Sequence, residues 1–158
     1  MLPSNYFNIN IYQLKVYDLF HGNNSISVTM PCESHGYNLI AYLAYMYHYQ
    51  RIVILAQSNF TAHELKFNFN LLMNWNKNHN VKFYGIQGLR NFEIDQVDIV
   101  IIFNYNICKL SNRHKSILEQ LSNSEKTKLM MISTYNNSTK DIISEMFLPN
   151  TCLYVDVN

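Results

Sequence analysis

The chain has 158 residues, of which 48% are hydrophobic, 15% are charged and 14% are aromatic, and its formal net charge is +1. Plentiful apolar residues and a low net charge exclude a long disordered chain, and 4 Gly with 3 Pro exclude a collagen-like one. This length suits a single domain built around one core. The near-neutral charge does not indicate a strongly basic nucleic-acid binder.

Cysteine usage and the absence of long apolar runs indicate where the protein works. Cys32, Cys108 and Cys152 form no Cys-x-x-Cys pair, which predicts reduced thiols in an intracellular protein. The N-terminus lacks a basic segment followed by an apolar one, and the apolar runs fall short of the roughly 20 residues that span a bilayer. The histidines are scattered without ligand spacing. We expect a cytoplasmic or nuclear protein that is not secreted, has no membrane partner and holds no metal.

Short apolar runs alternate along the chain with segments of helical periodicity. Strands are predicted over residues 25–30, 51–56, 81–86, 97–103, 128–134 and 152–157, and helices over 36–50, 61–76, 111–121 and 139–147. The first two helices carry apolar stripes made of Leu39, Ile40, Leu43, Met46 and Tyr47, and of Leu65, Phe69, Leu72 and Met73. The tyrosines around the first helix are expected to cover core and surface.

Strands that are apolar on both faces and separated by helices indicate a parallel sheet covered on two sides. The predicted fold is therefore an α/β three-layer sandwich with a mainly parallel sheet, forming one domain over residues 1–158. Ligands bind at the carboxyl ends of such strands. This edge points to four loops, over residues 31–36, 57–60, 104–109 and 135–138.

Five segments in this order resemble the first RecA-like lobe of superfamily 2 helicases and translocases. They read YQLKVYDLF, SISVTMPCESHGYNLIAYLAYMY, RIVILAQSNFTAHEL, VDIVIIFNYN and KLMMISTYN. The resemblance covers nearly the whole chain and implies a RecA-like fold, an ATP site and a nucleic-acid partner. Frequent Asn, Ile, Lys and Tyr suit an AT-rich genome such as that of a large DNA virus.

The phosphate loop of this family departs from its pattern here. Residues 30–37 read MPCESHGY where the family has MPCGSGKT, so Glu33 and His35 replace glycines, Gly36 replaces the Lys, and Tyr37 replaces the Ser/Thr. A carboxylate would repel phosphate, and the added Cβ atoms would crowd its approach. In the family the Lys neutralises phosphate charge and the Ser/Thr holds Mg²⁺.

The acidic DEAH motif is also missing. The matching positions 103–106 read FNYN, so neither the Asp that positions Mg²⁺ nor the Glu that orients water is present. Asn104 can coordinate a cation but cannot act as a general base. Asp98 lies inside the predicted strand, too early to reach the loop. Joint loss of all these groups predicts an ATPase lobe whose catalytic equipment has decayed, with no catalytic residues and no cofactor.

Some family positions are retained. The resemblance assigns Gln13 to adenine and leaves Ser34 and Gly36 as the remnant of a nucleotide site. It assigns Ser58, Asn59 and Arg90, which ends a second matching loop over 85–90, to contacts with a nucleic-acid backbone. The family needs a second lobe, and no segment of this sequence matches it, so we expect a protein partner or a homo-oligomer, with weaker binding of DNA or RNA.

The sequence is compatible with several functions. The favoured one is a non-hydrolysing helicase-like binding or scaffold module. The alternative is a nucleotide-binding protein or ATPase subunit, with a non-standard loop, that works with a separate second lobe. A third is a thiol enzyme built around Cys32, Glu33 and His35. A fourth interpretation treats these segments as ordinary loops of an unrelated α/β domain.

Overall fold

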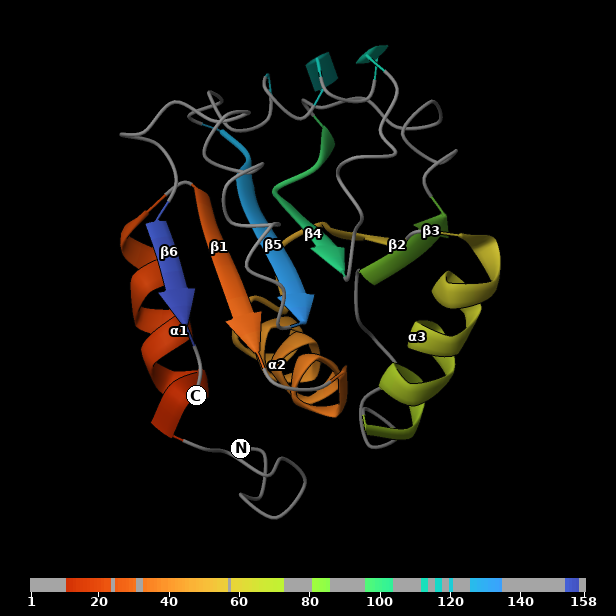
Figure 1. The fold of residues 1–158 in the computed structure, drawn as a ribbon, viewed down its shortest axis with the longest axis horizontal. Coiled ribbons are helices and arrows are strands. Elements are labelled where there is room, and N and C mark those ends of the chain that lie inside the picture. Colours follow the sequence, from red (N-terminus) through yellow and green to blue (C-terminus); the bar gives the residue numbers. More distant parts are fainter. Residues whose placement is uncertain are drawn as a thin grey trace.

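A computed structural model gives the fold of the chain (Figure 1). It describes residues 11–23, 25–30, 33–56, 58–72, 81–85, 96–103, 112–113, 116–117, 120, 126–134 and 153–156.

A twisted six-stranded sheet forms the centre of the molecule (Figure 1). Its strands are β1 (Ser25–Met30), β2 (Ile52–Ala56), β3 (Val81–Gly85), β4 (Ile99–Phe103), β5 (Lys128–Thr134) and β6 (Leu153–Asp156). Their order across the sheet is β3-β2-β4-β5-β1-β6, and every neighbouring pair is parallel. The predicted parallel α/β fold is confirmed. The strands at 25–30 and 128–134 have the predicted bounds, and the other four differ by one or two residues.

Three helices lie side by side: α1 (Ile11–Gly22), α2 (Glu33–Met46) and α3 (Asn59–Leu72). Helix α1 packs against β1 and α2, and α3 packs against α2, β2 and β3 (Figure 1). Within the predicted helix 111–121, the described residues are helical. The predicted helix 139–147 lies outside the described residues.

The bounds of α2 correct the prediction of a helix over 36–50. The helix starts at Glu33, three residues before the predicted start. It ends at Met46, and the following residues form a turn in which the Gln50 amide donates to the Tyr47 carbonyl at 2.8 Å.

The core lies between the sheet and these helices. All five residues of β2 and all five of β4 are buried, which is why both strands read as continuous apolar runs. Helix α2 is buried over all six residues from Leu39 to Ala44, because α1 and α3 flank it. Tyr42 is therefore buried too, while Tyr49 is 86% exposed. The tyrosines cover core and surface, as predicted.

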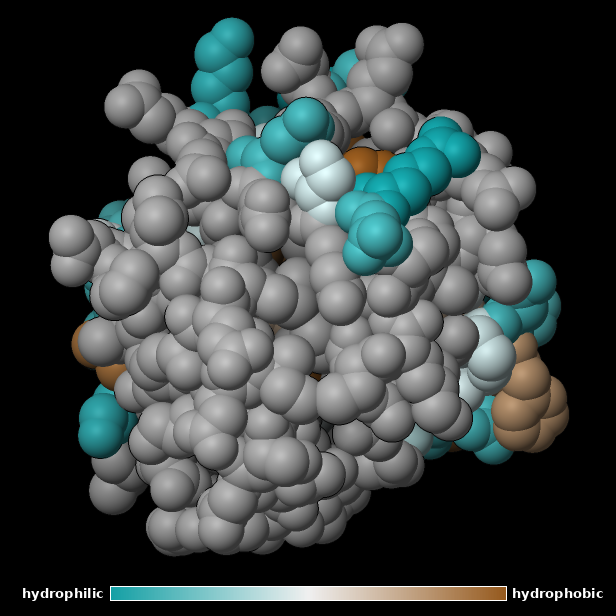
Figure 2. All heavy atoms as spheres, turned by 45° about the horizontal axis from the view of Figure 1, so that its top comes forward, coloured by the Kyte–Doolittle hydropathy of each residue, from teal (hydrophilic) through white to brown (hydrophobic). Residues whose placement is uncertain are grey.

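Helix α3 is apolar on two opposite faces. Its inner face buries Ala62, Leu65 and Phe69, and Phe69 contacts Phe83 of β3 with ring centroids 5.3 Å apart. Its outer face exposes Phe60, Phe67 and Leu71, at 71%, 65% and 62%. Figure 2 shows a hydrophobic patch at the right edge of the molecule, where α3 lies, with hydrophilic residues around it.

Tyr47 joins the end of α2 to α1. It is 9% exposed and packs against the rings of Tyr17, Phe20 and His21, with centroids 5.4, 6.0 and 6.4 Å away. Burial, and secondarily the neighbouring Tyr17, raises the pKa of Tyr47 to about 12. The phenol is therefore held in its neutral form by the fold.

Lys128, the first residue of β5, binds the carboxyl end of α1. Its Nζ donates to the carbonyl of Phe20 at 2.5 Å and to those of His21 and Asn23 at 3.1 Å each. The ammonium also lies 5.2 Å from the centroid of the Phe20 ring. The last carbonyls of a helix lack partners within the helix, so Lys128 supplies hydrogen bonds and a favourable charge there.

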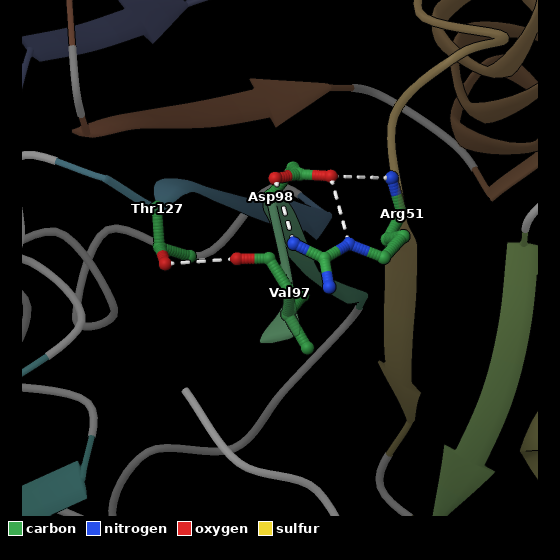
Figure 3. Close-up of polar contacts among 4 residues, drawn as sticks. All are labelled: Arg51, Val97, Asp98 and Thr127. Atoms are coloured by element: carbon green, nitrogen blue, oxygen red, sulfur yellow. Dashed lines mark hydrogen bonds and ion pairs between the residues drawn. The ribbon is translucent and has the colours of Figure 1, made fainter. Parts of the chain in front are cut away.

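Asp98 lies at the amino end of the sheet, one residue before β4 begins, and not inside the strand as predicted. Its carboxylate accepts hydrogen bonds from the Arg51 backbone amide at 2.8 Å and from Arg51 Nε at 3.2 Å (Figure 3). The side-chain hydrogen bond from Arg51 is the largest cause that lowers the pKa of Asp98. Beside it, Thr127 Oγ1 donates to the Val97 carbonyl at 2.9 Å. Asp98 thus ties two strand starts together, at the edge opposite the strand ends.

Candidate functional site

The carboxyl ends of β1, β2 and β4 define the edge where the sequence predicts a site. Strand β5 lies between β1 and β4. Of the four predicted loops, the structure describes residues 33–36 and 58–60. The loops over 104–109 and 135–138 lie outside the described residues, as does Arg90.

The connection from β1 to α2 differs from the predicted loop over 31–36. Strand β1 ends at Met30 and α2 starts at Glu33, so two residues separate them. Of the eight positions that match MPCGSGKT, the last five, from Glu33 to Tyr37, belong to the helix. A phosphate loop needs several residues of open backbone whose amides wrap the phosphates. Between β1 and α2, two residues of the chain are followed by the start of an α-helix.

Tyr37 and Phe103 meet at this edge. The Tyr37 ring stacks on the Phe103 ring, with centroids 5.6 Å apart and an angle of 23° between the planes. Phe103 is the last residue of β4 and is 2% exposed, and Tyr37 packs against the core. Both residues depart from the family pattern, but the sequence analysis did not predict that they contact each other. The feature of the sequence that could have indicated the contact is that both matched positions carry an aromatic residue.

Gln13 is fully buried in α1, at 0% exposure. The resemblance assigns it to an adenine edge, which requires an exposed amide. In this structure the side chain is enclosed by protein. Ser34 and Gly36 lie in the first two turns of α2, and Gly36 is buried. The structure does not bring Gln13 and Gly36 together in an open site.

Ser58 begins α3 as its N-cap. Its Oγ accepts a hydrogen bond from the Thr61 amide at 3.1 Å and lies 3.0 Å from Thr61 Oγ1. An N-cap of this kind satisfies an amide that the helix leaves free. Ser58 and Asn59 are both exposed, as a contact with a ligand would require. The structural role of Ser58 is thus explained without a ligand.

Gly85, the last residue of β3, lies directly against the start of α3. A Cβ added there would lie 2.8 Å from the Asn59 amide nitrogen and 3.0 Å from the Ser58 carbonyl carbon, and closer still to Asn59 Oδ1. Glycine is needed for this close approach. The structure therefore brings together two segments, at 58–59 and at 85, that the resemblance assigns separately to nucleic-acid contacts.

We expect Gly85→Ala to lower the free energy of unfolding by about 1–1.5 kcal/mol, at the low end for overpacking, because the α3 backbone has to shift. Urea denaturation measures this change. Gly22→Ala is the matched control, since nothing lies within 4 Å of a Cβ added at Gly22. Equal stability of the two variants would contradict the close approach.

The remaining candidates form no site in the described part of the chain. Cys32 and the side chains of Glu33 and His35 lie outside what the structure describes, so the thiol hypothesis stays a prediction. Among the residues with described side chains, no three His, Cys, Asp or Glu gather as a metal site would require. No helix within the described ranges is long and apolar enough to cross a bilayer.

Comparison with solved structures finds similarity to Pif1 helicases. A structure reported as the basis of DNA unwinding at forked double-stranded DNA by two coordinating Pif1 helicases has a TM-score of 0.51 and 12% identity. The match covers 94% of this chain and 44% of that one. Bacteroides Pif1 bound to single-stranded DNA has a TM-score of 0.47 and 10% identity, over 94% of this chain and 42% of that one. The chain thus spans less than half of each of these two helicase chains.

No protein-family model matches the chain, and no curated protein matches it. The likeness to the first Pif1 structure shows the fold of a RecA-like helicase lobe. The predicted RecA-like architecture is therefore confirmed. The assignment to superfamily 2 in particular gains no support from it.

Proposed function

We propose that the chain is a helicase-like module that binds a nucleic acid or a protein partner without hydrolysing ATP. The observation that carries the proposal is the connection between β1 and α2. Because five of the eight phosphate-loop positions are helical, two residues separate β1 from α2, and these are too few to wrap a triphosphate. We further propose that the chain derives from an active ATPase lobe whose catalytic residues have been lost. Its motif order is that of superfamily 2, and we propose that it comes from a large DNA virus.

Support for a nucleic-acid partner comes from the fold and from one surface. The first matched structure concerns DNA unwinding by Pif1 helicases. In this chain, Ser58 and Asn59 are exposed at the start of α3 and lie beside Gly85. Polar side chains at such an edge donate to phosphate oxygens and carry no base specificity. We therefore propose backbone contacts with little sequence preference.

The nucleotide half of the proposal is tested by thermal unfolding with and without Mg²⁺ and ATP or ADP, together with phosphate release. We expect no shift and no turnover at millimolar nucleotide. A ligand present at about 100 times its Kd would stabilise the fold by roughly 2.7 kcal/mol, which is readily detected. A magnesium-dependent shift would overturn the proposal in favour of a nucleotide-binding subunit that works with a separate second lobe.

The nucleic-acid half is tested by fluorescence anisotropy with labelled single-stranded DNA and RNA at low salt. We expect Asn59→Ala to weaken binding several-fold and Asn70→Ala to leave it unchanged. Both residues are exposed on α3, but Asn70 lies eleven positions along the helix, about 16 Å away. Arg90→Ala is measured in the same way and is also expected to weaken binding, because the resemblance assigns Arg90 to the nucleic-acid backbone. If neither nucleic acid binds, the proposal reduces to a protein partner.

A further inference from the structure

Two residues from distant parts of the chain occupy the positions that hold magnesium in the family resembled. Tyr37 stands in α2 at the Ser/Thr position, and Phe103 stands at the end of β4 at the position of the acidic Asp. In the structure these side chains stack on each other, with ring centroids 5.6 Å apart. Two positions that share one ligand ought to be neighbours, so the contact supports the alignment from which the proposed function starts.

The residues present do not fit a magnesium ion at this junction. Mg²⁺ requires about six oxygen ligands at roughly 2.0–2.1 Å and usually keeps several waters. The Phe103 side chain has no oxygen and is 2% exposed, at the end of a strand whose five residues are all buried. Offset-stacked rings are in van der Waals contact. A hydrated cation therefore does not fit between the Tyr37 and Phe103 rings.

We infer that the Tyr37–Phe103 stack replaces a bound magnesium ion as the connection between α2 and β4. This inference deepens the proposed function and rests on the same alignment. The stack sets the buried Phe103 ring directly against the partly buried Tyr37 ring. It also fastens the start of α2 to the sheet by aromatic packing, which needs neither a cation nor a phosphate. The stack thus excludes a magnesium ion from the space between these two residues while it keeps the helix in place.

A double-mutant cycle tests the stack. The variants are Tyr37→Leu, Phe103→Leu and the pair together, each unfolded with urea. We expect the two substitutions to be coupled, so that the double variant unfolds about threefold to tenfold less readily than independent effects predict, as for other aromatic pairs. Tyr37→Phe is the matched control, because it keeps the ring. Should Phe103→Leu fail to fold, Phe103→Met completes the cycle.

The same proteins are then unfolded with Mg²⁺ alone and with Mg²⁺ and ADP. We expect no change in the midpoint for the wild-type chain. Additive effects in the cycle without any nucleotide response would overturn the stack and leave the proposed function standing. A midpoint that rises with Mg²⁺, and no longer does so in Tyr37→Phe, would overturn the inference, because the phenol would then be a ligand. ATP hydrolysis with the coupling intact would support the stack and overturn the proposed lack of hydrolysis instead.

Discussion

Lys128→Met is expected to lower the free energy of unfolding by about 1.5–3 kcal/mol, the range for hydrogen bonds made by a charged group. The ammonium donates to three carbonyls at the end of α1 and lies over the Phe20 ring. Methionine keeps the length of the side chain but has no donor. The Phe20 carbonyl, which is partly buried, then loses a bond that water replaces poorly. Urea denaturation at neutral pH measures the loss.

Lys82→Met is the matched control for this prediction. Lys82 also lies on a strand of the same sheet, in β3, but it is exposed. Substitutions at exposed positions away from such contacts usually change stability by less than about 0.5 kcal/mol. A Lys128→Met protein as stable as the Lys82→Met protein would show that Lys128 does not hold α1 to the sheet.

The Tyr47→Phe protein is expected to lose less unfolding free energy than the wild-type chain when the pH is raised above 10. The pKa of Tyr47 is raised from 10.0 to about 12, so the folded state keeps a proton that the unfolded state releases. The stability that this provides is fully present below pH 10 and is lost as the pH rises from 10 to 12. The difference of about two pKa units corresponds to roughly 2–3 kcal/mol. Urea denaturation from pH 8 to pH 12 measures it.

Tyr49→Phe controls for the loss of a tyrosine as such. Tyr49 is 86% exposed and lies two residues from Tyr47. Its substitution should leave the alkaline profile of the wild-type chain unchanged. If Tyr47→Phe loses as much stability between pH 10 and 12 as the wild type does, burial of the Tyr47 phenol does not shape the profile.

The sheet could be predicted from the sequence because its strands carry their own signal. Strands β2 and β4 are buried on both faces, and a strand in that environment is apolar at every position. Helix α1 was not predicted. Among its described side chains, those of Gln13, Val16 and Phe20 are buried, so a glutamine interrupts the apolar stripe that identifies a helix. Packing of α1 against α2 and β1 stabilises this helix although its sequence lacks a continuous apolar stripe.

The candidate site could be predicted only in part. Alignment to the family identifies Tyr37 and Phe103 as the wrong residues for a metal, which needs no structure. That the two rings touch depends on where β4 and α2 lie in space, and residues 66 positions apart give no local signal of it. The close approach of Gly85 to Asn59 likewise depends on the positions of β3 and α3 in space, and the sequence gives no local signal of it. The predicted start of α2 is three residues late, because Gly36 resembles a helix boundary.

The strand order also determines how the chain can assemble. Strand β2 pairs with β3, the next strand in the chain, and with β4. Strand β1 is different, since Ser25 pairs with Leu129 and Ile26 with Leu153. During synthesis, β1 therefore has no neighbouring strand to pair with until β5, about a hundred residues later in the chain, has left the ribosome. Long-range pairing of this kind forms late, because the intervening chain must be ordered first. The segment from β2 to β4 would then pair first, β1 would join the sheet only after β5 has formed, and the edge strand β6 would follow, because its neighbour in the sheet is β1.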